Sequence, residues 1–330
     1  MAKGYHHLTY ELRCQLYTLI KRGDSPALIA NELGVDRSTI YRELSRNKGG
    51  RGYRFKQAQQ LSSERRRAVS SRPRKMTPST ISVIIEKLNL KWSPEQISGW
   101  LHKVEHPHAS SHETIYQYIW EDKKNGGSLY KNLRHHGKKY NKRSSGTAGR
   151  GCIPNRVDID ERPKIVEKKN RIGDWELDTI IGKGHKGAIV SIVDRASKLT
   201  KLIKVPNKTA EAVQEAILKK LLPIQDWVLT LTADNGKEFA NHEQIAAILQ
   251  GEFYFAKPYH SWERGLNEHT NGLVRQYCPK TMSFENLTQS QLDEIEIELN
   301  DRPRKVLGYN TPKEIFGQRK LETPIDLAHS

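Results

Sequence analysis

Apolar residues recur at helical spacing in two short segments of the N-terminal region, which are separated by Gly34. The inward-facing positions lie at i, i+1 and i+4 of the first segment and at i and i+4 of the second. They are Ile29, Ala30, Leu33, Ile40 and Leu44. Two short amphipathic helices joined at a glycine are typical of a helix-turn-helix, so we predict such a module over residues 1–61.

The second of these segments carries polar and aromatic side chains on its outward side, all able to reach a phosphate or a base edge. The candidate DNA contacts are Arg37, Ser38, Thr39, Tyr41, Arg42 and Arg46. A plain helical hairpin would show the same apolar spacing. The basic residues around the segment favour DNA binding over that alternative.

A second pair of amphipathic segments occupies residues 92–101 and 110–122. Each begins with a serine in N-cap position, Ser93 in the first and Ser110 in the second, with a glutamate close behind. The apolar stripes are Ile97, Trp100 and Leu101 in one segment and Ile115, Tyr118 and Ile119 in the other. We predict a second helix-turn-helix over residues 76–134, with a helical pair that only packs as the alternative. Its candidate DNA contacts are His112, Thr114 and Tyr116.

Four histidines cluster in the gap between these two segments. They are His102, His106, His108 and His112. A zinc site is one interpretation, but the cluster has no cysteine partners, no recognised ligand spacing and Pro107 inside it. We therefore favour a solvated loop.

From residue 166 onward the apolar pattern changes to that of strands and longer helices. A hairpin turns at Asp194, and the elements then alternate between helix and strand. The predicted strand regions are residues 173–182, 187–205, 228–240 and 252–256, and the predicted helices between them are residues 209–222 and 242–250. This order predicts an α/β domain over residues 166–330, with a mixed sheet covered by helices and a C-terminal helix.

Charge divides the chain into two parts. The 330 residues hold 55 Lys and Arg against 38 Asp and Glu, a net charge of +17. Residues 1–150 contain 29 basic and 12 acidic side chains, and the remainder contains 26 of each. Residues 62–75 and 135–165 are rich in basic and small residues and read as linkers, or for the first as an arm that tracks DNA. The basic part suits a polyanion, and the neutral part resembles an ordinary globular domain.

Several classes of protein are disfavoured by composition. Mean hydropathy is −0.74, and no apolar run approaches the roughly 18 residues that a membrane span needs. The first residues show no apolar core of a secretory signal. Three distant cysteines without C-x-x-C spacing argue against a disulfide framework. We expect a cytoplasmic, nucleoid-associated protein with no membrane partner.

Acidic residues stand at notable positions on the predicted strands. Asp174, Glu176 and Asp178 share one face of the first strand because side chains alternate with period two. Asp234 follows the apolar run of residues 228–232, where the chain turns. Acids that only solvate strand ends are the alternative interpretation.

Residues 261–277 have helical spacing with an apolar and a polar side. The apolar side is formed by Trp262, Leu266, Leu273 and Tyr277, and the opposite side by Glu268, Asn271 and Arg275. Glu268 is therefore a candidate to point into a site. Arg275 lies two turns further on and could hold a DNA phosphate, and Asn271 is a further candidate DNA contact.

Asp178, Asp234 and Glu268 together have the chemistry of a phosphoryl-transfer site. Carboxylate oxygens are the hard ligands that Mg²⁺ or Mn²⁺ prefers. Two such ions roughly 3.5 to 4 Å apart can activate an attacking oxygen and stabilise a leaving one. The sequence thus predicts a metal site with two ions, Mg²⁺ or Mn²⁺.

Four segments resemble one known family: WELDTIIG, TADNGKEF, WERGLNEHTNGLVRQY and LNDRPRKVLGYNTP. With 33 residues between Asp234 and Glu268, the chain resembles a DDE-type bacterial transposase of the family typified by insertion sequence thirty. The resemblance covers nearly the whole chain. It departs from the family at Leu177, where a glycine is usual, and at His269, where an asparagine is usual.

The resemblance implies a ribonuclease-H-like catalytic domain of the retroviral-integrase kind, with Asp178, Asp234 and Glu268 as the catalytic triad and Arg275 as the basic residue after it. It also implies two helix-turn-helix modules that bind terminal inverted repeats. The partners would be double-stranded DNA, both element ends and target, and a homodimer or larger assembly would form on it. An inactive DNA-binding regulator and a ribonuclease H acting on hybrids are the alternatives.

Overall fold

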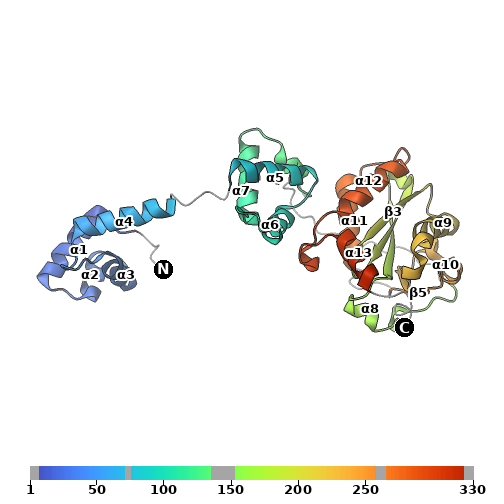
Figure 1. Ribbon diagram of the computed structural model, residues 1–330, viewed down its shortest axis with the longest axis horizontal. Helices are drawn as coiled ribbons and strands as arrows, with labels where there is room; N and C mark the ends of the chain where they lie inside the picture. The colour runs from blue at the N-terminus through green and yellow to red at the C-terminus, as the bar shows by residue number, and fades with distance from the viewer. Residues whose placement is uncertain (1–6, 71–75, 135–152, 258–264, 323–330) are drawn as a thin grey trace. The chain divides into compact units, whose positions relative to one another are not determined.

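The structure is a computed structural model that describes residues 7–70, 76–134, 153–257 and 265–322. The chain forms two compact units, Met1–Arg74 and Lys75–Ser330 (Figure 1). The first unit is helical. The second combines a helical module with a five-stranded sheet and the helices that cover it.

The first unit contains the predicted helix-turn-helix. Its helices are α1(Tyr10–Arg22), α2(Pro26–Glu32), α3(Arg37–Asn47) and α4(Phe55–Ser70). Ser25 caps α2 and Asp36 caps α3, each side chain accepting a backbone N–H of the first turn. Gly34 has a φ of +66°, a conformation that costs glycine little, and this permits the tight turn between the two helices. Ile29 and Ile40 are buried in the core, as predicted.

An ion pair lies at the centre of this helical unit. Arg13 of α1 and Glu43 of α3 are both nearly buried, and the Nε–Oε1 distance is 2.8 Å. The Arg13 guanidinium also donates to the carbonyl of Leu8 and to the side chain of Gln59 on α4. Tyr53 donates its hydroxyl to Glu43 at 3.0 Å. Because these partners come from three helices, the pair fixes how α3 sits on the rest of the unit.

Residues 62–70, which the sequence assigned to a linker or an arm that tracks DNA, continue helix α4. The stretch holds no proline or glycine before residue 71, and Arg, Glu and Ala are good helix formers. Ser62 is half-buried against α1, where it accepts from Arg13 at 3.2 Å. The basic run Arg65–Arg67 therefore stands on a helix.

The second unit begins with a helical module. Its elements are α5(Pro78–Asn89), α6(Pro94–Lys103), α7(His112–Lys124) and the 3-10 helix η1(Leu129–Asn132). Ser93 and Gln96 form the capping box of α6, which confirms Ser93 as a cap. The prediction of Ser110 as the cap of α7 was wrong by one residue, since Ser111 accepts from the Thr114 N–H at 3.3 Å. Ser110 is fully buried, so its hydroxyl is turned away from the helix end.

The five strands form one mixed sheet. They are β1(Asp174–Ile181), β2(Ala188–Asp194), β3(Thr200–Val205), β4(Thr230–Ala233) and β5(Glu252–Phe255). Their spatial order is β3-β2-β1-β4-β5, with β2 antiparallel to both neighbours and β1, β4 and β5 mutually parallel. This arrangement is the ribonuclease-H-like sheet that the resemblance implied.

Helices cover both faces of the sheet (Figure 1). On one face α9(Ala210–Leu221) and α10(His242–Leu249) pack on Leu177 and Val190. On the other, α11(Gly265–Tyr277) and α12(Gln289–Asn300) pack on Ile180 and Ile189. The remaining helices are α8(Ile165–Lys168), α13(Pro312–Glu322) and the 3-10 turns η2(Ile159–Glu161), η3(Lys183–His185), η4(Leu222–Trp227), η5(Lys237–Phe239) and η7(Lys305–Leu307). Since Asp178 lies two residues before Ile180, it shares the face that α11 covers.

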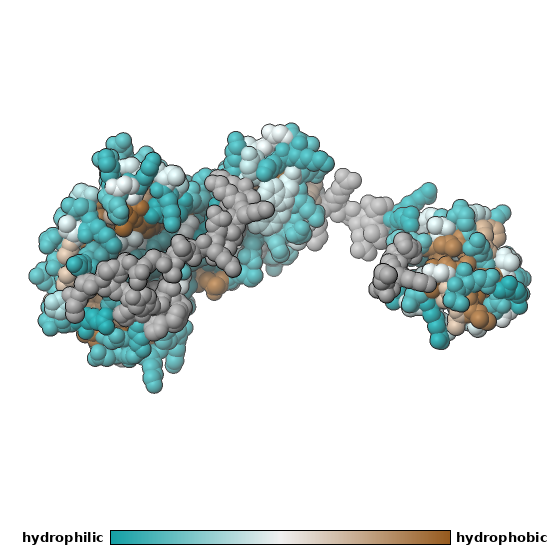
Figure 2. All heavy atoms as spheres, turned by 180° about the vertical axis from the view of Figure 1, so that it is seen from behind, coloured by the Kyte–Doolittle hydropathy of each residue, from teal (hydrophilic) through white to brown (hydrophobic). Residues whose placement is uncertain are grey.

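Hydrophilic residues cover most of the face shown in Figure 2. Among the helices that the structure describes, none is long and apolar enough to cross a membrane. Trp262, which the sequence placed on the apolar side of the helix with Glu268, lies outside the described residues.

Candidate active site and DNA-binding surfaces

Asp178 and Asp234 come from neighbouring parallel strands. Strands β1 and β4 pair in the register Asp174 to Thr230 and Glu176 to Thr232. The pairing ends there; Asp178 follows two residues later on β1, and Asp234 directly follows the last residue of β4. Because neighbouring strands lie roughly 4.8 Å apart, the two aspartates lie on adjacent strands near the carboxyl end of β4. Both side chains are half-buried, so solvent reaches them.

Helix α11 orients the carboxylate of Asp178. The Nδ2 of Asn271 donates to Asp178 Oδ2 at 2.6 Å, and the backbone N–H of Thr179 donates to Oδ1 at 2.9 Å. Asn271 is itself held, since the hydroxyl of the buried Ser191 donates to its Oδ1 at 3.0 Å. Asn271 was predicted to contact DNA, but in this structure its amide is engaged between β1 and β2.

Three side chains fasten α11 along strand β1. Asn267, which is buried, donates to the carbonyl of Leu177 at 3.2 Å. Asn271 follows one turn later. Arg275 donates from Nη2 to the carbonyl of Ile181 at 2.8 Å and lies over the ring of Phe284. Burial lowers the pKa of Arg275. The guanidinium predicted to hold a DNA phosphate is thus already engaged with the end of β1.

Glu268 lies on the first turn of α11 and its side chain is exposed. It precedes Asn271 by three residues, a rise of about 4.5 Å along the helix, so the two lie on neighbouring positions of one side. Within residues 7–70, 76–134, 153–257 and 265–322, no three His, Cys, Asp or Glu side chains come close enough to hold a metal ion. The structure therefore places the two aspartates on neighbouring strands and Glu268 on the helix that packs beside β1, and the three carboxylates form no metal-holding cluster among the described residues.

The loop that carries Asp234 is held by a residue that the sequence analysis missed. The carboxylate of Glu238 is buried, and it accepts from Thr179 Oγ1 at 3.0 Å and from Lys208 Nζ at 2.5 Å. Gly236 passes so close that an added Cβ would lie 2.3 Å from a Glu238 oxygen. Thr179 directly follows Asp178, so Glu238 links the turn after Asp234 to the residue next to Asp178. The only sequence signal was an acid directly before the apolar Phe239.

The other acids on the face of β1 are structural. Asp174 is completely buried, where it pairs with Arg171 and accepts from Thr230 at 2.9 Å. Glu176 is 1% exposed and pairs with Arg195 at 2.7 Å. Asp174 and Glu176 do lie on the same face of β1 as Asp178, as predicted. Both are buried and paired with an arginine, so neither is available to bind a metal ion or substrate.

The first unit presents the predicted basic face on α3. The exposed members are Arg37, Tyr41, Arg42 and Arg46, while Ser38 and Thr39 are half-buried. The guanidinium of Arg37 stands over the Tyr41 ring and donates to its hydroxyl at 3.2 Å. A hollow of about 210 Å³ brings Arg42 and Arg46 next to Arg65 and Arg66 of α4. The sequence assigned Arg65 and Arg66 to a linker or an arm that tracks DNA, and in the structure they stand on α4 beside the α3 residues.

The candidates on the second helical module have mixed surroundings. His112 is exposed at the start of α7. The hydroxyl of Thr114 lies 3.0 Å from that of Ser111 and belongs to the helix cap. Tyr116 packs against the core of the module, and burial raises its pKa. Only His112 presents an unobstructed surface of the kind predicted for a DNA contact.

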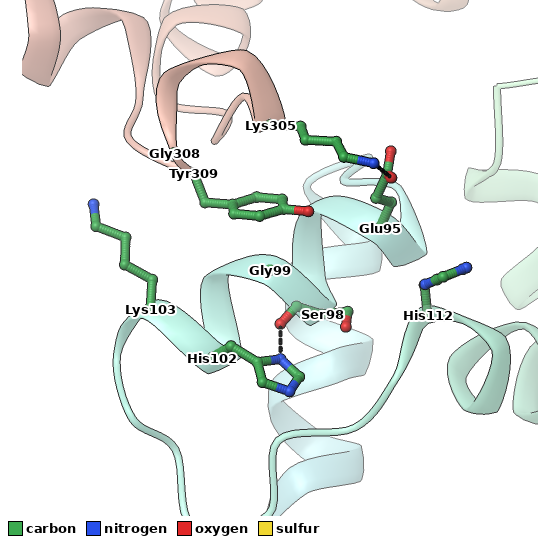
Figure 3. Close-up of a pocket in the computed structure, with 9 residues that line it drawn as sticks. All are labelled: Glu95, Ser98, Gly99, His102, Lys103, His112, Lys305, Gly308 and Tyr309. Atoms are coloured by element: carbon green, nitrogen blue, oxygen red, sulfur yellow. Dashed lines mark hydrogen bonds and ion pairs between the residues drawn. The ribbon is translucent and has the colours of Figure 1, made fainter.

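This module packs against the segment that follows α12. Figure 3 shows the Tyr309 ring lying over Gly99 of α6 and the ion pair between Lys305 and Glu95, with a distance of 2.7 Å. Gln96 also donates to the carbonyl of Pro303 at 2.9 Å. An added Cβ on Gly99 would lie 2.0 Å from the Tyr309 ring, so this contact requires glycine. The hollow beside the contact has a volume of about 590 Å³, and His112 lies on its rim.

Comparison with known proteins gives consistent matches. A helix-turn-helix domain family matches residues 4–47. The transposase for insertion sequence element IS4351 of Bacteroides fragilis is 50% identical over 313 residues, which cover 94% of this chain and 96% of that protein. Transposase InsI for insertion sequence element IS30A of Escherichia coli is 33% identical over 327 residues, covering 94% and 83%. The solved catalytic core domain of BIV integrase is 25% identical and covers 46% of this chain and 97% of its own, with a TM-score of 0.36.

Proposed function

The chain belongs to the IS30 family of insertion-sequence transposases, and on that premise we propose that it cleaves and joins DNA by a DDE mechanism. As a transposase with a helix-turn-helix domain, it is a DNA-binding enzyme. The proposal concerns the chemistry and the residues. Asp178, Asp234 and Glu268 would hold divalent ions, Mg²⁺ or Mn²⁺, and the helical modules would bind the terminal inverted repeats.

The donor set suits such ions. Carboxylate oxygens are the ligands that Mg²⁺ and Mn²⁺ prefer, and Asp178 is already oriented by Asn271 and the Thr179 N–H. Asp234 accepts the N–H of Gly236 at 3.0 Å, so its carboxylate is also oriented. When bound, two ions would lower the charge on the attacked phosphate and stabilise the attacking and leaving oxygens.

The reaction would proceed by two in-line displacements. In the first, the oxygen of a water molecule attacks a phosphodiester, the bond to the 3′ oxygen breaks, and a 3′-OH is released. In the second, that 3′-OH attacks another phosphodiester and displaces its leaving oxygen, which joins the strands. The chain would contribute by holding the carboxylates in place, and no covalent bond to the protein forms. Asn267, Asn271 and Arg275 would position α11, and with it Glu268, against the end of β1.

The observation that carries this proposal is the carboxylate of Asp178 on β1, which is held by the helix that bears Glu268, beside the parallel strand β4 that Asp234 directly follows. DNA contacts would come from the exposed α3 residues of the first unit and from His112. Two ends must be joined, so we expect a homodimer or larger assembly on DNA.

Substitution of the carboxylates tests the proposal. Asp178→Asn, Asp234→Asn and Glu268→Gln should bind a duplex carrying the element's end as the wild type does but neither cleave nor join it. Glu294→Gln, an exposed acid on α12, is the matched control and should remain active. Complete strand transfer by one of the three variants would remove that residue from the mechanism. If the wild type neither cleaved nor joined such a duplex, whether or not Mg²⁺ or Mn²⁺ was added, the result would instead favour a DNA-binding regulator.

A further inference from the structure

A cavity of about 260 Å³ lies beside helix α11, between the second helical module and the segment that follows α12. The residues on which the argument depends are Lys91, Arg134, His269, Gln276, Arg302 and Arg304. His269 directly follows Glu268 in the chain. The cavity is therefore adjacent to the helix that carries the third candidate carboxylate.

The wall of this cavity is strongly cationic. Arg302 and Arg304 are 1% and 8% exposed, and Arg134 and Lys91 add two further positive charges. The acid on the wall is Glu95, which is paired with Lys305 at 2.7 Å. Across the described part of the chain, neither Arg302 nor Arg304 forms a salt bridge with a carboxylate.

The hydrogen bonds of the two buried arginines go to neutral groups. Arg304 donates from Nη2 to the carbonyl of Leu299 at 2.8 Å. Arg302 donates to Gln276 Oε1 at 3.1 Å and to the hydroxyl of Tyr277, which in turn donates to Glu298 at 2.6 Å. In the described structure the Nε atoms of both arginines are buried without a hydrogen-bond partner. Arg302 thus has an indirect counter-charge through Tyr277, and Arg304 has none.

Burying a cation without a counter-ion is costly, because the charge loses its hydration and gains no attraction in return. The effect of this uncompensated positive charge is visible in the pKa of Arg304. Burial together with the charge of Arg302 lowers the pKa of Arg304 to about 10. An anion in the cavity would relieve this repulsion.

We propose that this cavity is an anion site that takes a phosphate group of bound DNA. Guanidinium groups match the oxygens of a phosphate, and three of them line one small space. A phosphate seated there would fix the strand next to the turn of α11 that bears Glu268. The choice of DNA as the source rests on the proposed function, whereas the anion site itself rests only on the charges and the cavity.

Inorganic phosphate probes the site without DNA, metal or activity. We would follow thermal unfolding of the full chain in phosphate and in sodium chloride of equal ionic strength. Phosphate should raise the unfolding temperature of the wild type by about 3 °C at saturation. Arg134→Gln should lose most of this rise, because Arg134 lines the cavity. Since Arg134 is exposed, we expect the variant to fold. Lys131→Gln, an exposed cation three residues away that does not line the cavity, should keep it.

The Arg304→Met variant is a second, independent test of the proposed anion site. Removal of an uncompensated buried charge should leave the phosphate-free unfolding temperature unchanged or raise it, while the response to phosphate falls. A purely structural arginine would give the opposite pattern, a lower unfolding temperature with an unchanged phosphate response, and that result would overturn the proposal. Equal phosphate responses in the wild type, Arg134→Gln and Lys131→Gln would overturn it as well.

A DNA-binding experiment identifies the source of the phosphate. With a duplex carrying the element's end, Arg134→Gln should bind roughly tenfold more weakly than the wild type, and the slope of log affinity against log salt should fall by about 0.9. Neutral methylphosphonate at one position of that duplex should weaken the wild type and leave Arg134→Gln unaffected. If phosphate stabilises the wild type but no such position exists, the site takes free phosphate and the DNA assignment is wrong. The unfolding experiment with inorganic phosphate requires no catalysis. Its result would therefore stand even if the assignment of the three catalytic carboxylates were wrong.

Discussion

Asn271→Ala would keep the Asp178 carboxylate, the proposed metal ligand, but remove the side chain that orients it. The variant therefore tests how much the orientation of this ligand contributes to metal binding. Asn271 donates to Asp178 at 2.6 Å and is held by Ser191. Without the Asn271 amide, the Asp178 carboxylate can rotate away from the orientation that it has in the wild type. We expect Asn271→Ala to fold, because the side chain is only half-buried and no core residue is lost.

The size of the effect follows from the kind of bond that is removed. A hydrogen bond to a charged group contributes about 1.5 to 3 kcal/mol, and 1.4 kcal/mol is a factor of ten in an equilibrium constant. Asp178 is half-buried, so water replaces part of the lost bond and the lower end of that range applies. The Mg²⁺ concentration for half-maximal cleavage should therefore rise about tenfold, in line with the usual loss when a residue that orients a metal ligand is removed.

The assay is cleavage of a labelled duplex that carries the element's end, measured across a Mg²⁺ titration, with binding of the same duplex measured without metal. Ser191→Ala keeps the donated bond but loosens Asn271, so its half-maximal Mg²⁺ should rise by a smaller factor, about threefold. Binding without metal should be unchanged in both variants. A Mg²⁺ titration of Asn271→Ala that coincides with that of the wild type would refute the reasoning.

Two further predictions concern stability. Glu43→Gln leaves the buried guanidinium of Arg13 without its counter-charge, so the free energy of local unfolding measured by hydrogen exchange of α1 and α3 amides should fall by about 3 kcal/mol, and unchanged exchange would contradict this account. Burial lowers the pKa of Lys198 to about 8 from 10.5, so the unfolded state binds more protons between those pH values and stability should rise with pH across that window. Lys198→Met should show a flatter profile of unfolding temperature over the same range, and parallel profiles would argue against the depressed pKa.

Elements with a strong local signal could be predicted from the sequence. The glycine turn at Gly34 with its two amphipathic helices, the capping box at Ser93 and the strand that carries Asp178 all appear where the pattern placed them. In each case a few neighbouring residues determine the conformation. The misplaced cap of α7 shows the limit, since two adjacent serines give the same local signal and only the burial of Ser110 distinguishes them.

Features that depend on distant partners could not be predicted in this way. Nothing near Glu238 indicates that its carboxylate accepts from Thr179, 59 residues earlier in the chain. Likewise, the helical course of residues 62–70 depends partly on packing against α1, which composition does not report. The cationic cavity beside α11 exists only because Arg134 and Arg304 meet across a gap of 170 residues in sequence.

The fate of the three acids on strand β1 shows how the fold selects a functional residue from an ambiguous pattern. Period two puts Asp174, Glu176 and Asp178 on one face, and the pattern treats them as equals. In the structure the first two are buried and bound by Arg171 and Arg195, so their charges are neutralised within the protein. Asp178 lies furthest along the strand, next to the strand β4 that Asp234 directly follows, and the neutral amide of Asn271 orients it without cancelling its charge. A carboxylate oriented by a neutral donor at a solvent-reached sheet edge retains the capacity to bind a cation, which the two paired acids have lost.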